Sequence, residues 1–112
     1  MKYVSIDIET TGIDPVENDI IEFAAVIDDT SENRPVLELP RFQKYIKKDG
    51  KYICDAQAIV MHKHIFEKIL QDVDCLYVND LMYAFGNFLQ DNGIQPNRYG
   101  QIIINVAGKN FG

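Results

Sequence analysis

Two apolar segments near the N-terminus, separated by a polar turn, constrain the fold more than any other feature of the chain. In residues 3–8 the aliphatic side chains fall at every second position, which is typical of a strand with one buried face. Residues 10–18 contain Gly12 and Pro15 and are typical of a turn. Residues 19–29 are too densely apolar to alternate, so they fit a buried strand or a short helix. We favour a strand, because a polar loop and a further extended segment follow.

The rest of the chain predicts one more strand, two helices and a last strand. Residues 36–46 would supply the extended partner. Apolar spacing predicts a helix over 56–70, with Asp55 or a neighbour as its cap, and a second helix over 78–90 that the Asn-Gly pair at 92–93 would end. Residues 101–106 again have the composition of a strand.

This order of elements predicts an α/β fold built on one mixed sheet. Three strands would form an antiparallel start, and a helical crossover would then return the last strand parallel to the first. No linker or repeat divides the chain, and 112 residues suit a single domain. The sequence stops directly after the last predicted strand, so we expect residues 1–112 to be the N-terminal portion of a domain that is incomplete at its C-terminal end.

Composition excludes several classes of protein. The longest apolar run is far shorter than the roughly 20 residues that span a bilayer, so no membrane partner is expected. Asp7 interrupts the N-terminus before an apolar stretch long enough for a secretory signal. Cys54 and Cys75 have no metal-ligand spacing and form no disulfide framework. A cytoplasmic location is therefore expected.

Charge is unevenly distributed along the chain. The net charge of −6 argues against a protein that coats nucleic acid through bulk electrostatics. Residues 1–40 carry ten acidic and two basic side chains, whereas residues 41–51 carry five basic and one acidic. Such a division fits a cation site beside a phosphate track, and it also fits a solvated edge strand guarded by lysines. Charge alone leaves both interpretations open.

Asp7 and Glu9 are the strongest candidates for chemistry. They lie two residues apart on a predicted strand, so their side chains share one face, with Cα atoms about 6.5 Å apart. Converging carboxylates repel each other unless a cation neutralises them, and a hard ion such as Mg²⁺ prefers oxygen ligands of this kind. The pair D-x-E is nevertheless common on exposed strands. A calcium loop beginning at Asp7 is disfavoured, because its twelfth position is Asn18 instead of Glu and no helix precedes it.

A longer string around this pair identifies a family. The stretch Y-V-S-I-D-I-E-T-T-G-I-D-P-V-E-N-D-I-I-E-F-A-A-V-I resembles the first motif of the DnaQ-like, DEDD 3′ to 5′ exonucleases in order and spacing. The resemblance implies a ribonuclease H-like fold in which Asp7 and Glu9 bind two Mg²⁺ or Mn²⁺ ions. It also implies that Asp7 bridges the two ions, that Glu9 holds one of them, and that Thr10, Thr11 and Gly12 meet the terminal nucleotide.

The C-terminal stretch matches the family less completely. Q-I-I-I-N-V-A-G-K-N-F-G is similar to the strand that leads into the second motif, close to G-x-N-x-x-F-D, which makes Asn110 a candidate substrate contact. The Asp of that motif is absent, and the third motif, with its general base and final Asp, has no counterpart. His62 and His64 lie too early in the chain to supply that base, and we expect structural or surface roles for both.

The function predicted from the sequence is therefore that of a 3′ to 5′ exonuclease acting on the single-stranded 3′ end of DNA or RNA. With two of four expected carboxylates and no base, the 112-residue chain itself is expected to be inactive. Uncovered apolar surface would favour self-association. A noncatalytic module that binds nucleic acid or protein with the same fold is the alternative, and an unrelated α/β domain with an accidental motif is a third interpretation.

Overall fold

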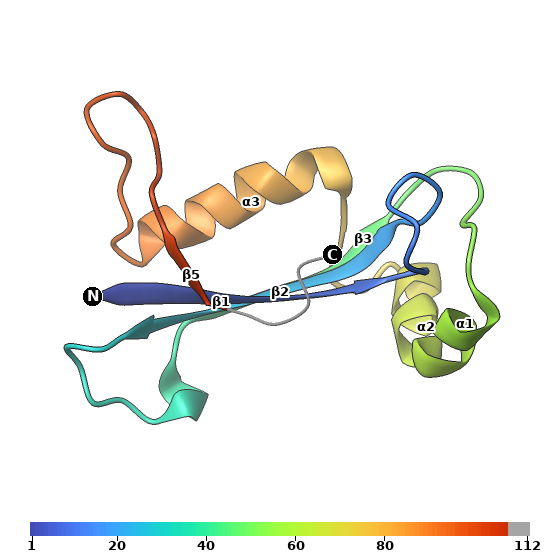
Figure 1. Ribbon diagram of the computed structural model, residues 1–112, viewed down its shortest axis with the longest axis horizontal. Helices are drawn as coiled ribbons and strands as arrows, with labels where there is room; N and C mark the ends of the chain where they lie inside the picture. The colour runs from blue at the N-terminus through green and yellow to red at the C-terminus, as the bar shows by residue number, and fades with distance from the viewer. Residues whose placement is uncertain (108–112) are drawn as a thin grey trace.

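A five-stranded mixed sheet forms the centre of the computed structural model, which describes residues 1–107 (Figure 1). The strands are arranged in the order β4-β3-β2-β1-β5. β1 (Lys2–Thr10), β2 (Ile20–Asp29) and β3 (Arg41–Lys47) pair antiparallel in succession. The predicted three-strand antiparallel start is therefore confirmed, and residues 19–29 do form a strand.

Two short strands extend the sheet on either side. β4 (Cys75–Tyr77) pairs parallel with β3, and β5 (Asn105–Ala107) pairs parallel with β1. α3 (Val78–Asp91) follows β4 directly and packs over one face of the sheet before the chain returns to β5 (Figure 1). The predicted helical crossover and parallel last strand are thus confirmed, although that strand begins only at Asn105.

The structure corrects two predicted elements and adds one that was not predicted. β3 begins at Arg41 instead of residue 36, because Pro40 separates it from a 3-10 turn, η1 (Val36–Glu38). The helix expected over 56–70 is two helices, α1 (Ala56–Met61) and α2 (Lys63–Gln71). Asp55 occupies the N-cap position of α1, but its side chain makes no capping hydrogen bond. β4 was not predicted at all.

The basic segment, residues 41–51, also differs from a simple edge strand. β3 lies second from the edge, and β4 covers its last residues, Tyr45 to Lys47. Only the first part of β3 lacks a neighbour on that side among the described residues. Within β3, the interpretation of residues 41–51 as a lysine-guarded edge therefore holds only for Arg41 to Lys44, four of the seven residues of the strand.

The core lies between α3 and one face of the sheet. α3 buries Leu81, Phe85 and Leu89 on one side, as expected for an amphipathic helix. These side chains join Val4 and Phe23 in the buried cluster, and the Phe23 and Phe85 rings meet edge to face with centroids 4.9 Å apart. Alternate residues of β1 face this core, so the side chains between them face the opposite side of the sheet.

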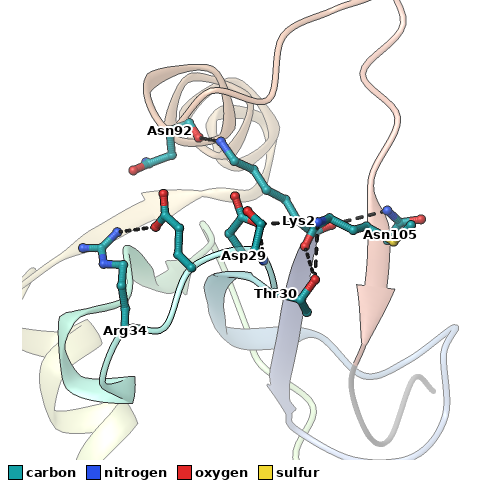
Figure 2. A network of polar contacts seen from close by, with 9 residues as sticks. Lys2, Asp29, Thr30, Arg34, Asn92 and Asn105 are labelled. Carbon is teal, nitrogen blue, oxygen red and sulfur yellow. Dashed lines mark hydrogen bonds and ion pairs between the residues drawn. The ribbon is translucent and has the colours of Figure 1, made fainter.

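A polar network holds the N-terminal end of β1 in place (Figure 2). Lys2 Nζ donates to the Asn92 carbonyl at the end of α3 at 2.7 Å, and Asn105 Nδ2 donates to the Lys2 carbonyl at 3.3 Å. The terminal amine contacts Asp29 Oδ1 at 3.4 Å. β1 is thus tied to α3, β2 and β5 at one end, while its other end leads into a loop beside α1 and α2 (Figure 1).

Among residues 1–107, no helix combines the length and the apolar character that crossing a membrane requires.

Candidate active site

Asp7 and Glu9 line one pocket, of about 870 Å³, at the C-terminal end of β1. Val4, Ile6 and Ile8 of the same strand pack against the core, so the two carboxylates project from the other face. Asp7 is exposed and lies opposite Ala24 of β2, whose small side chain leaves space beside it. Within the described residues Asp7 makes no hydrogen bond or ion pair, so its oxygens are open to the pocket.

Glu9 is held by a histidine from the helical layer. Its Oε2 lies 3.3 Å from Nε2 of His62, a residue that occupies the break between α1 and α2 and also lines the pocket. The His62 side chain is 12% exposed and that of Glu9 is 36% exposed. One carboxylate oxygen of Glu9 therefore contacts a protein side chain, whereas the Asp7 carboxylate contacts none among the described residues.

A third carboxylate lies across the strands from Glu9. Glu22 pairs with Glu9 in the β1–β2 register, an arrangement of like charges that is unfavourable without compensation. Gln43 Nε2 donates to Glu22 Oε2 at 2.9 Å and draws this carboxylate toward β3. Burial and the nearby Glu22 charge raise the pKa of Tyr45, the residue opposite Glu22 on β3. Glu22 therefore belongs to the sheet face and is not a lining residue of the pocket.

The loop after β1 is organised around Thr11. Its side chain is fully buried, and its hydroxyl accepts hydrogen bonds from Asn18 Nδ2 at 3.2 Å and from the Asp19 backbone N–H at 3.0 Å. Asn18 Nδ2 also donates to the Ile53 carbonyl at 2.8 Å, and the Asp55 N–H donates to the Thr11 carbonyl at 2.8 Å. The loop is therefore fastened to the segment that leads into α1.

Gly12 packs closely against two neighbouring side chains. A Cβ atom at this position would lie 2.5 Å from both Asn18 Oδ1 and Asp55 Oδ2, so these side chains would have to move to accept it. The Thr10 hydroxyl donates to the Gly12 carbonyl at 2.7 Å and closes the turn from inside. The T-T-G sequence thus has a local structural basis in addition to any contact with a ligand.

The structure brings four of the six predicted site residues together. Asp7, Glu9, Thr10 and Gly12 all line the pocket, whereas the Thr11 side chain is buried beneath the loop and faces away from it. The Thr11 backbone is occupied as well, because its N–H donates to the Asp19 carbonyl at 2.9 Å and its carbonyl accepts from the Asp55 N–H at 2.8 Å. Asn110, like Phe111, lies outside the described residues.

Two titratable residues of the pocket lining, His62 and Asp14, were missed by sequence reasoning. His62 was expected to have a structural or surface role, and a continuous helix gave no reason to direct it at Glu9. The signal for Asp14 was only its place in the loop after the motif. His64, by contrast, is exposed on α2 and is not a lining residue, as expected for a surface side chain.

The pocket is acidic and provides some of the ligands that a hard cation needs. Its described lining includes Asp7, Glu9 and Asp14 but no Lys or Arg, so no fixed cation neutralises the carboxylates there. Oxygen donors of this type fit Mg²⁺ or Mn²⁺. Within residues 1–107, however, no three His, Cys, Asp or Glu side chains come close enough together to hold a metal ion. Asp7 and Glu9 therefore fit as part of a metal site.

The basic segment borders a second, smaller hollow of about 280 Å³. It shares Pro15, Asn18 and Ile20 with the acidic pocket and is lined on its far side by Lys47 and Lys48. Both ammonium groups are already paired: Lys47 with Asp72 at 2.8 Å and Lys48 with Asp19 at 3.0 Å. Their charge is therefore largely compensated within the protein.

Comparisons with known proteins agree with this geometry. A family model described as Exonuclease (RNase_T) matches residues 4–106. The solved structure of cell-death related nuclease 4 superimposes with a TM-score of 0.63 at 18% identity, over 96% of this chain and 33% of that chain. A search of curated proteins gave no match.

The similarity to the solved structure shows the fold of the chain, and the match to the family model shows the family to which the chain belongs. The five-stranded mixed sheet with its helices is a ribonuclease H-like α/β fold. The chain spans about a third of the length of the solved nuclease. Since the family model covers nearly all of the described residues, the chain belongs to the Exonuclease (RNase_T) family.

Proposed function

We propose that this chain carries part of a 3′ to 5′ exonuclease site that hydrolyses nucleic-acid phosphodiesters by two-metal catalysis. Membership of the exonuclease family supports a nuclease, and hence a nucleic-acid substrate. The observation that carries the finer proposal is the position of Asp7 and Glu9, which line a single pocket that has no Lys or Arg in its described lining. Such a pair attracts divalent cations, and among the described residues only Glu9 has a partner for its charge, His62.

In this proposal the two carboxylates have different roles. Asp7 lines the pocket, and its side chain has no partner among the described residues, so it would bridge two Mg²⁺ or Mn²⁺ ions. Glu9, with one oxygen at His62, would hold a single ion through the other. When bound, the ions supply an activated water and stabilise the leaving 3′ oxygen. The protein contributes the fixed direction of both side chains from one strand.

The rest of the pocket suits the terminal nucleotide of a single strand. Ile8, Ile13 and Ile20 provide apolar lining beside the acidic groups, and Ile13 is 96% exposed. Thr10 and Gly12 bring backbone groups to the same rim. A sugar and base would contact the apolar side chains while the phosphate approaches the carboxylates through the ions. No feature of the pocket distinguishes DNA from RNA.

We propose that the 112-residue chain is inactive by itself. Asp7 and Glu9 supply two carboxylates, and His62, the only histidine in the described lining, is already engaged by Glu9. Two-metal hydrolysis needs further ligands and a base that takes the proton of the attacking water. The described lining of the pocket does not supply them.

The polarity of degradation tests the proposal. A single-stranded oligonucleotide labelled at its 5′ end would be incubated with Mg²⁺ and a chain extended beyond Gly112 along its reading frame. We expect products that shorten one nucleotide at a time, while the same oligonucleotide labelled at its 3′ end releases labelled mononucleotide from the outset. A circular oligonucleotide, which has no end, should remain intact.

Other results would contradict the proposal in distinguishable ways. Cleavage of the circle would indicate an endonuclease, and release of the 5′ label as mononucleotide would indicate the opposite polarity. An oligonucleotide that is bound by the extended chain but never shortened would support the noncatalytic binding module instead. Robust Mg²⁺-dependent cleavage by the 112-residue chain would refute its proposed inactivity.

A further inference from the structure

We propose that His62 is a positioning residue, which fixes the carboxylate of Glu9 through the polar contact of its Nε2 with Oε2. The inference rests on the proposed function above, because it concerns how one presumed metal ligand is aimed. The direct observation is the 3.3 Å separation of these two atoms, between a strand and a helical segment far apart in the sequence. His62 is also the only histidine in the described lining of the pocket.

The backbone at His62 is held from both sides. Its N–H donates to the Ala58 carbonyl at 2.9 Å, which completes the end of α1. Its carbonyl accepts from the Ile65 N–H at 3.0 Å and from the Phe66 N–H at 3.2 Å, which begins α2. Its dihedral angles, φ −114° and ψ 26°, interrupt the helical path between them. The side chain therefore leaves a fixed corner of the backbone.

The other end of α1 is fastened to the loop that follows Glu9. The Asp55 N–H bonds the Thr11 carbonyl, and the Asn18 amide bonds the Ile53 carbonyl, both at 2.8 Å. The six residues of α1 cover about 9 Å of helix axis. Glu9 is therefore linked to His62 in two ways: directly through the side-chain contact, and indirectly through Thr11, Asp55 and α1. These links hold the Glu9 carboxylate in place relative to the loop that borders the same pocket.

The contact with His62 determines which oxygen of Glu9 is available to a cation in the pocket. With Oε2 engaged by His62, Oε1 is the atom left for a cation in the pocket. A free glutamate side chain would lose rotamer freedom each time it bound an ion, and a pre-formed contact with His62 removes part of that cost. Asp7, on its shorter side chain, has no such brace among the described residues. The longer of the two acidic side chains, Glu9, is therefore the one that a protein contact holds in place.

Proton NMR of the metal-free chain tests the contact itself. An imidazole N–H that faces a carboxylate and belongs to a side chain only 12% exposed should exchange slowly enough with water to give a low-field signal, whereas the exposed His64 ring should give none. We expect one such signal, lost in His62→Gln and in Glu9→Ala and retained in His64→Ala. Absence of the signal from the wild type, or its persistence in Glu9→Ala, would overturn the proposal.

Mn²⁺ titration then tests what the contact does. We expect His62→Ala to weaken Mn²⁺ binding about 10-fold, the lower limit typical for a residue behind a metal ligand. His62→Gln keeps an N–H donor and should recover most of the affinity, while His64→Ala should bind as the wild type does. Equal affinity in His62→Ala and wild type would refute the positioning role.

The two readouts separate this inference from the proposed function. If the wild type bound no Mn²⁺, or if Asp7→Ala bound it unchanged, the metal site would be refuted while the NMR signal still decided the His62 contact. If His62→Ala failed to fold, His62→Gln would be used instead to test the contact between His62 and Glu9. A folded His62→Gln that retained the low-field signal would count against the proposal.

Discussion

Replacing Asp7 by asparagine is expected to reduce the rate of phosphodiester hydrolysis about 10³-fold in a chain long enough to cut nucleic acid. The substitution keeps the size of the side chain and removes its negative charge. Asp7 is exposed and makes no hydrogen bond or ion pair within residues 1–107, so the fold should not change. Single-turnover cleavage at saturating Mg²⁺ measures the effect on the chemical step.

Asp28→Asn is the matched control for this substitution. Asp28 is an exposed carboxylate at the opposite end of the same pair of strands, where it lies opposite Tyr3. It is not a lining residue of the acidic pocket, and we expect wild-type rates from the variant. Hydrolysis by Asp7→Asn at a rate similar to that of Asp28→Asn would show that the reacting centre lies elsewhere.

Replacing Phe85 by alanine is expected to lower the free energy of unfolding by about 3–5 kcal/mol. Phe85 is 4% exposed at the centre of the core, with ring centroids 4.9 Å from Phe23 and 5.8 Å from Phe42. A domain of this size has about 5–15 kcal/mol of stability in total, so much of the variant should be unfolded near its growth temperature. Chemical denaturation followed by circular dichroism provides the measurement.

Tyr83→Ala separates this core effect from a general effect on α3. Tyr83 lies two residues earlier on the same helix and is 79% exposed. Its truncation should change the free energy of unfolding by only about 0.5 kcal/mol. Losses of similar size in the two variants would mean that α3 does not pack against the sheet as described.

Much of the fold followed from local periodicity. The alternation in residues 3–8 placed the aliphatic side chains on the core face of β1, and with them it placed Asp7 and Glu9 together on the other face. The apolar spacing of residues 78–90 predicted α3 almost to its last residue, because that helix has one continuous buried side. Where one face of an element is buried along its whole length, the sequence carries the pattern.

The remaining features depend on contacts between distant residues. β4 has only three residues and gains its partner from β3, so no alternation could reveal it. The break at His62 divides a stretch whose apolar spacing is helical throughout. The His62–Glu9 contact joins residues that β2, β3 and α1 separate in the sequence. Thr11 looked like a ligand contact because of its motif, but the buried hydroxyl serves the loop.

The most direct test of the central claim is Mn²⁺ binding to the purified chain, measured by water-proton relaxation. The claim is that Asp7 and Glu9 hold divalent ions in one pocket. It predicts that the wild type binds Mn²⁺, that Asp7→Ala binds it far more weakly, and that Asp28→Ala binds it as the wild type does. Unchanged affinity in a folded Asp7→Ala variant would contradict the claim.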